Sequence, residues 1–149
     1  IAGDGKEKDR LQRLAREQLP HQYHFVGKIP REEMYRYYSA SDLFVFPGIR
    51  ESLGMVFLEA QACGLPVVAF DNDGVPEAVN AGVTGLLTPA FDTGAFEKAI
   101  ARLLSDVQLR RRMGQAAKAY VREVHDLNQN YKKMETVLQN IISGTERHN

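Results

Sequence analysis

The chain has 149 residues, 44% of them hydrophobic, which is enough to bury the core of one globular domain. Lysine plus arginine equals aspartate plus glutamate, at 19 each. This balance excludes an overall field that would draw the chain to nucleic acid or anionic lipid. The single cysteine, Cys63, excludes an internal disulfide and favours a reducing, cytoplasmic compartment. No apolar run approaches the roughly 20 residues that span a bilayer, and no signal peptide is evident.

The apolar spacing predicts helices and strands that alternate along the chain. In chain order, the expected elements are a strand end at 1–2, a helix over 11–19, a short strand over 24–26, a helix over 30–38, a strand over 43–46, a helix over 52–63, a strand over 66–70, a short helix from Pro76, and three helices from Asp92 onward. The run over 43–46 is apolar throughout, as in a strand covered on both faces. The last helix is expected near 128–142. The chain starts at Ile1 rather than Met, which suggests an excised part of a longer protein.

Short apolar strands that alternate with helices predict parallel strands joined by right-handed crossovers. The expected fold is therefore α/β, a Rossmann-like parallel sheet with helices on both faces and a helical C-terminus. We expect one domain over 1–143 and a frayed tail over 144–149. Such sheets bind ligands at the carboxyl ends of their strands. The turns expected there are 3–6, 27–31, 47–54 and 71–76.

The turn over 47–54 contains the most informative residues. It leads into a helix start, where backbone amides favour an anion, and Ser52 is the expected N-cap. Glu51 lies just before this helix, and Glu59 lies eight residues on, roughly 12 Å along a helix. Carboxylates suit pairs of sugar hydroxyls, so the spacing fits a diphosphate with a polyol on each side, as in a sugar nucleotide. On spacing alone, another interpretation stays open: Glu51 as a helix-dipole partner and Glu59 as a solvated surface residue.

Other motifs carry weaker indications. Gly3-x-Gly5 lacks the third glycine of a dinucleotide fingerprint and is interpreted as a tight turn. Asp71-x-Asp73 could hold a divalent cation with a diphosphate, but such a loop more often has only turn chemistry. No metal site is expected, and the cation stays an open alternative. The four histidines lack metal-ligand spacing. The run 110–112 of three arginines is expected to be a solvated helix face.

The stretch from Phe46 to Ala69 resembles the signature of the large retaining glycosyltransferase family of GT-B fold, called group 1 or family four. Its hallmark is two glutamates separated by seven residues, here Glu51 and Glu59, followed by Glu-Ala-x-Ala-x-Gly-x-Pro-Val. The resemblance extends over almost the whole chain, through 3–5, 25–27, 40–43, 74–77 and 82–87. The loop over 72–74 departs from the pattern, with Asp73 where the family often has glycine.

This resemblance implies a two-domain enzyme. Its carboxyl-terminal domain, to which this chain would correspond, binds a nucleotide diphosphate sugar and needs no cofactor. By position, Glu51 would contact the donor sugar as the catalytic residue, and Glu59 would bind the ribose. The other implied donor-binding residues are Gly27, Lys28 and Ile29 beside the base, and Ser52, Leu53, Gly54, Met55 and Val56 at the sugar and diphosphate. The family's basic pair and its acceptor domain lie upstream of Gly3, so we expect the chain alone to bind donor weakly and to transfer nothing. Any peripheral association with a membrane would come through that acceptor domain. The resemblance also implies that the last helix, near 128–142, packs towards this domain.

Two alternatives stay open. The chain could be a non-catalytic nucleotide-sugar-binding module, or part of a nucleotide-sugar epimerase of the same fold. A phosphorylase would need a lysine-bound cofactor, and no lysine has an evident pocket. The base, the sugar and the acceptor do not follow from the sequence.

Overall fold

The computed structural model describes residues 1–49, 51–52 and 54–145. The chain divides into two compact units, Ile1–Tyr37 and Tyr38–Asn149, and each is considered by itself. The first unit contains helix α1 (Lys8–Gln18) and the 3-10 turn η1 (Arg31–Glu33), and helix α2 (Met34–Ser39) runs from the first unit into the second. The predicted helix over 30–38 is therefore confirmed, with Pro30 as its N-cap and a tighter first turn.

The two strands predicted in the first unit do not form a sheet. Ala2 and Gly27 make one isolated parallel bridge. The Gly3 amide donates to the Gly27 carbonyl oxygen (N···O 2.7 Å), and the Val26 amide donates to the Ile1 carbonyl oxygen (3.0 Å). The prediction of a strand over 24–26 is thus wrong. Gly3 and Gly27 have φ of 122° and 72°, outside the extended region, so the pairing cannot continue through them.

The second unit contains a parallel sheet of three strands, in the order β1 (Phe44–Phe46), β2 (Val67–Asp71) and β3 (Gly85–Pro89). In its register Val45 lies opposite Val68, and Ala69 lies opposite Leu87. This confirms the parallel sheet that the sequence predicts. The central strand is buried over its first four residues, but β1 is an edge strand of this sheet and Val45 is 37% exposed. The expectation that β1 is covered on both faces is wrong at Val45.

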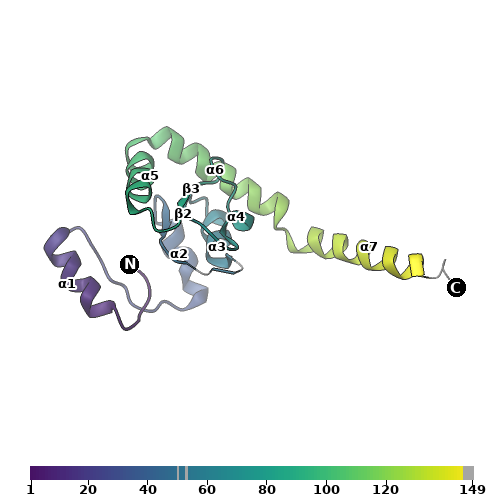
Figure 1. Ribbon diagram of the computed structural model, residues 1–149, viewed down its shortest axis with the longest axis horizontal. Helices are drawn as coiled ribbons and strands as arrows, with labels where there is room; N and C mark the ends of the chain where they lie inside the picture. The colour runs from purple at the N-terminus through teal and green to yellow at the C-terminus, as the bar shows by residue number, and fades with distance from the viewer. Residues whose placement is uncertain (50, 53, 146–149) are drawn as a thin grey trace. The chain divides into compact units, whose positions relative to one another are not determined.

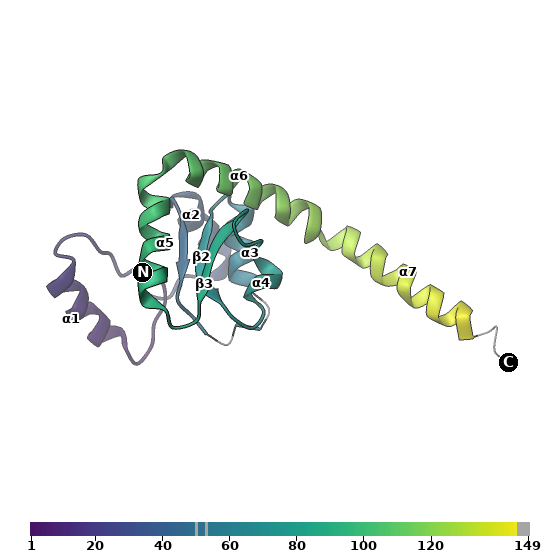
Figure 2. The same ribbon diagram turned by 45° about the horizontal axis from the view of Figure 1, so that its top comes forward.

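Helices cover both faces of this sheet, as predicted (Figures 1 and 2). One face carries α3 (Met55–Ala62) and α4 (Val75–Ala78), and the other carries α5 (Thr93–Ser105). Helix α6 (Val107–Val124) runs across the end of the sheet and packs against both α3 and α5 (Figure 2). Successive residues of a strand point to opposite faces, and β2 supplies both. The core on the α3 side contains Phe57, Val67, Ala69, Val75, Ala78 and Val79, and the core on the α5 side contains Val68, Ala99, Leu103 and Met113.

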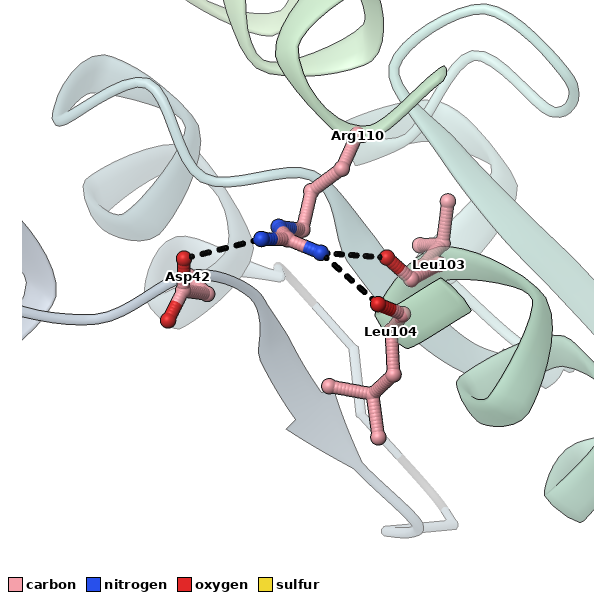
Figure 3. A network of polar contacts seen from close by, with 4 residues as sticks. All are labelled: Asp42, Leu103, Leu104 and Arg110. Carbon is pink, nitrogen blue, oxygen red and sulfur yellow. Dashed lines mark hydrogen bonds and ion pairs between the residues drawn. The ribbon is translucent and has the colours of Figure 1, made fainter. Parts of the chain in front are cut away.

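The Arg110 side chain ties three segments together at the amino edge of the sheet (Figure 3). Its Nη1 donates to the carbonyl oxygens of Leu103 (2.8 Å) and Leu104 (3.1 Å), at the end of α5. Its Nη2 pairs with Asp42 Oδ1 (3.2 Å), two residues before β1. The prediction of a solvated arginine face is therefore wrong for Arg110, whose side chain is only 17% exposed. A helix that ends on a cation is stabilised, because its last carbonyls otherwise lack partners.

The last helix, α7 (Leu127–Thr145), continues beyond the predicted boundary at 143 (Figure 1). Its apolar side chains are exposed: Leu127, Tyr131, Met134, Val137, Leu138, Ile141 and Ile142, each between 53% and 81%. The expected packing of this helix towards another domain stays a prediction. Within the described ranges, no helix combines the length and apolarity that crossing a bilayer requires.

Candidate functional site

Two loops meet at the carboxyl edge of the sheet, because β1 and β2 are parallel and end at the same edge. One loop connects β1 to α3, and the other connects β2 to α4. The Gly74 amide of the second loop donates to the Glu51 carbonyl oxygen of the first (N···O 3.0 Å). A Cβ at residue 74 would collide with the Ser52 carbonyl oxygen and would lie 3.1 Å from that of Glu51. Glycine is therefore required for the two loops to approach this closely.

The Glu51 side chain folds back over the start of α3. Its Oε1 accepts a hydrogen bond from the Gly54 amide (N···O 3.3 Å). Gly54 has φ of 65°, and a Cβ there would lie 2.7 Å from the Ala78 Cβ of α4. The left-handed turn at Gly54 thus brings the carboxylate to the amino end of the helix. This geometry is what the helix-dipole interpretation of Glu51 requires, and it also places an acceptor beside an anion-binding helix start.

The predicted start of this helix needs correction. Helix α3 begins at Met55, with Gly54 as its N-cap and no side-chain capping bond, so the predictions of a start at 52 and of Ser52 as the cap are wrong. A left-handed residue cannot continue a right-handed helix, and Gly54 therefore sets the boundary. The interval from Glu51 to Glu59 is helical only from Met55 onward. The roughly 12 Å rise expected for eight helical residues does not apply.

Glu59 lies in the last turn of α3 and is half-buried. Its charge acts on the hydroxyl of Tyr38, a residue of α2 that is 5% exposed. Burial, followed by the nearby Glu59 and Cys63, raises the pKa of Tyr38 to about 12. The phenol therefore keeps its proton at neutral pH. The interpretation of Glu59 as a solvated surface residue is wrong.

Gln61 fixes α3 against α4. It is fully buried, and its Nε2 donates to the carbonyl oxygens of Ala78 (2.7 Å) and Phe57 (3.2 Å). Sequence reasoning missed both Gln61 and Tyr38, since the helical spacing marks their positions only as inward-facing. A polar residue such as Gln61 on the inward face of a short helix is a signal that a buried hydrogen bond is needed.

The remaining predicted residues occupy three situations. In the second unit, Ser52 is exposed, Met55 is 46% exposed and Val56 is half-buried at the start of α3. Leu53 lies outside the described residues. Gly27, Lys28 and Ile29 belong to the first unit, where Gly27 makes the bridge to Ala2, Lys28 is exposed and Ile29 is half-buried.

The loop over 71–74 has the geometry of a turn. Asp73 has φ of 46°, and its Oδ2 accepts a hydrogen bond from Asn72 Nδ2 (3.2 Å). A left-handed backbone favours glycine, and aspartate tolerates this conformation better than most side chains. Among the described residues, no group of three or more potential ligands could hold a metal ion.

Comparisons with known proteins agree with this geometry. Residues 1–120 match the family described as glycosyl transferases group 1. The D-inositol 3-phosphate glycosyltransferase of Corynebacterium jeikeium is 41% identical over 117 residues, which make up 78% of this chain and 28% of that protein. The chain thus spans little more than a quarter of this relative's length.

Solved structures show the same fold. Sucrose-phosphate synthase from Thermosynechococcus elongatus superposes with a TM-score of 0.80 and 33% identity, over 94% of this chain and 35% of that one. HepE from Anabaena, in complex with UDP, gives a TM-score of 0.79 and 27% identity, over 93% and 40% of the two chains. The signature around Glu51 and Glu59, the parallel sheet with its two interlocked loops, and the match over 120 residues have one explanation: the chain belongs to the group 1 glycosyl transferases of GT-B fold.

Proposed function

We propose that this chain is the donor-binding part of a retaining glycosyltransferase, which transfers a sugar from a nucleotide diphosphate sugar to an acceptor. One observation carries the proposal: the Gly74 amide holds the Glu51 backbone, so that the Glu51 carboxylate lies at the amino end of the helix that also bears Glu59. An anion-binding helix start between two carboxylates suits a diphosphate with a sugar on each side.

The roles follow from this arrangement and from the family signature. Glu51 contacts the donor sugar as the catalytic residue, and Glu59 accepts hydrogen bonds from the ribose. The backbone at the start of α3, with Gly54, Met55 and Val56, faces the sugar and the diphosphate. Amides aimed at the leaving diphosphate stabilise the charge that develops there as the glycosidic bond opens. The reaction is expected to need no metal or other cofactor.

The rest of the enzyme is part of the same proposal. In the first unit, the Gly27–Ile29 turn flanks the base. A preceding domain supplies the acceptor site, the basic groups for the diphosphate and any contact with a membrane surface, and the exposed apolar stripe of α7 packs against that domain. Burying such a stripe removes apolar side chains from water, which favours association.

The first test is a calorimetric screen of UDP-, GDP- and ADP-glucose and of GDP-mannose against the chain. We expect weak binding of one nucleotide class and no transfer by the chain alone. Glu51→Gln in the full-length enzyme should lower kcat by at least about 100-fold, the scale seen when a charged or hydrogen-bonding group at a reaction centre is removed. Glu97→Gln, at an exposed position of α5, serves as the matched control. If no donor binds, or if Glu51→Gln leaves the rate unchanged, the proposal is wrong.

The two alternatives predict different products. A binding module would show no turnover in the full-length protein while donor binding persists. An epimerase would convert or hydrolyse its nucleotide sugar without a separate acceptor. Product analysis with and without acceptor therefore separates the three possibilities.

A further inference from the structure

Helix α4 contacts the Glu51 segment at both of its ends. Before its first residue, the Gly74 amide donates to the Glu51 carbonyl oxygen (N···O 3.0 Å). At its last residue, Ala78 lies so close to Gly54 that a Cβ on Gly54 would be 2.7 Å from the Ala78 Cβ. The Gly54 amide in turn donates to Glu51 Oε1 (3.3 Å). A shift of α4 would therefore move both the backbone and the carboxylate of Glu51.

Helix α4 is too short to hold this position alone. It has four residues, and its turn is closed by the bond from the Val79 amide to the Val75 carbonyl oxygen (2.9 Å). An isolated helical turn is unstable, because ordering its backbone costs more than its hydrogen bond returns. Val75 and Ala78 are buried in the core, but apolar contacts have no direction and do not fix the helix about its axis. A directional contact is needed in addition.

Gln61 of α3 supplies this directional contact. Its side chain is fully buried, and Nε2 donates to the carbonyl oxygens of Ala78 (2.7 Å) and of Phe57 (3.2 Å), four residues back in the same helix. Both amide hydrogens are thereby used. The other amide atom, Oε1, is buried and has no hydrogen-bond partner among the described residues. A buried acceptor without a donor costs stability, so a glutamine is useful here for the bonds that its nitrogen makes.

We propose that Gln61 is a positioning residue for the transfer reaction: through Ala78 it holds the Glu51 carboxylate in place for the donor sugar. The inference rests on the proposed catalytic role of Glu51. Gln61 is fully buried and does not touch the donor in this arrangement. Its effect is on the rate, because a small displacement of a reacting group slows the chemical step.

The test compares two variants of the full-length enzyme, at a temperature where circular dichroism shows both to be folded. Gln61→Met keeps the length of the side chain and removes the two donated hydrogen bonds. Leu103→Ala is the control for lost stability, since Leu103 is fully buried in α5, on the other face of the sheet. Both should lower the melting temperature. We expect kcat to fall about 3- to 10-fold in Gln61→Met, the change that corresponds to one lost hydrogen bond, and to stay within about twofold in Leu103→Ala.

Two further measurements separate positioning from a general structural effect. In a Glu51→Gln background, Gln61→Met should lower kcat by no more than about twofold, because residues that act through one group are non-additive. Ala78→Gly keeps the backbone acceptor of Gln61 but removes the methyl group that lies against Gly54. It should also lower kcat with Glu51 present and not in Glu51→Gln, and it decides the question if Gln61→Met does not fold. Equal losses in the two backgrounds would overturn the inference.

The outcomes also separate the inference from the proposed function. If Glu51→Gln lowers kcat and Gln61→Met does not, only the role of Gln61 is wrong. If Glu51→Gln leaves kcat unchanged, the catalytic role of Glu51 is wrong, and the role of Gln61 is wrong with it.

Discussion

The two edges of the same parallel sheet use charged side chains in opposite ways. At the amino edge, Arg110 makes hydrogen bonds of 2.8 and 3.1 Å to the end of α5 and an ion pair of 3.2 Å to Asp42 (Figure 3). Its donors are used within the protein. At the carboxyl edge, Glu51 accepts one amide at 3.3 Å, a long hydrogen bond, from a residue three positions away.

This difference suggests that Arg110 contributes to stability and that Glu51 is available for binding. The ion pair of Arg110 with Asp42 joins residues 68 positions apart, so its loss should lower the unfolding free energy. The long bond of Glu51 is local, and a ligand hydroxyl could replace it at little cost. The amino edge is thus expected to act as a structural tie, and the carboxyl edge as a preformed acceptor for ligand.

The largest expected effect on both stability and binding is at Gly74, at the carboxyl edge, where substitution by alanine adds one methyl group. Gly74→Ala places a Cβ against the Ser52 carbonyl oxygen and should displace the Glu51 backbone. We expect a loss of about 2–3 kcal/mol in unfolding free energy, as for an overpacked site, and a fall in nucleotide affinity of at least tenfold. Urea denaturation and calorimetry measure the two effects.

The matched control is Gly144→Ala in α7, where an added Cβ meets nothing within 4 Å. At the end of an exposed helix this change should alter the unfolding free energy by less than about 0.5 kcal/mol and leave affinity unchanged. Unchanged nucleotide binding in Gly74→Ala would contradict the role given to the interlocked loops.

At the amino edge, Arg110→Ala should lower the unfolding free energy by about 1–3 kcal/mol, because it leaves two helix-end carbonyls without their donor. Nucleotide affinity should stay within about twofold of the wild type, since the contacts of Arg110 lie at the other edge of the sheet. Arg112→Ala, at an exposed position of the same helix, is the control and should change stability by less than about 0.5 kcal/mol. A large loss of affinity in Arg110→Ala would show that the two edges are coupled.

The smallest expected effect is a dependence of stability on alkaline pH. The pKa of Tyr38 is about 12 in the folded chain, compared with 10.0 for an ordinary tyrosine, so above pH 10 the unfolded chain loses a proton that the folded chain retains. The contribution of Tyr38 to the unfolding free energy is therefore fully present below pH 10, and it falls as pH rises towards 12. The difference in unfolding free energy between wild type and Tyr38→Phe should shrink by about 1 kcal/mol from pH 9 to pH 11. A difference that is constant with pH would show that the Tyr38 proton is not held by its surroundings.

The sequence predicted the parallel sheet because β2 is a short apolar run between segments with helical spacing. It also indicated a candidate site, because the glutamate pair lies in a specific motif, and the roles of the two glutamates stay a prediction. It did not predict where α3 begins, since that boundary depends on the left-handed backbone at Gly54 and on the fit of this glycine against Ala78. The contact of Gly54 with Ala78 joins segments distant in sequence, and helix propensities, which depend on local sequence, do not predict it.

The partners of single polar residues were also beyond prediction. Arg110 lies in a run of three arginines whose spacing is typical of a solvated face, yet only the fold brings it to Asp42 and to the end of α5. Tyr38 matches the apolar spacing of α2, and only the fold brings its hydroxyl under the influence of Glu59 in α3. The order of elements was therefore predictable, and the pairing of polar groups was not.

The parallel register of β1 and β2 has a consequence for folding. A hairpin can join antiparallel neighbours early, but β2 can pair with β1 only after α3 has crossed between them, and such non-local pairing closes late. The bond between Gly74 and Glu51 joins the loops that follow β1 and β2, so it forms only when these two strands are in register. A partly folded chain would then have the signature sequence without the site. Nucleotide binding should therefore select the completed fold and raise its melting temperature, with ligand concentration setting the size of the gain.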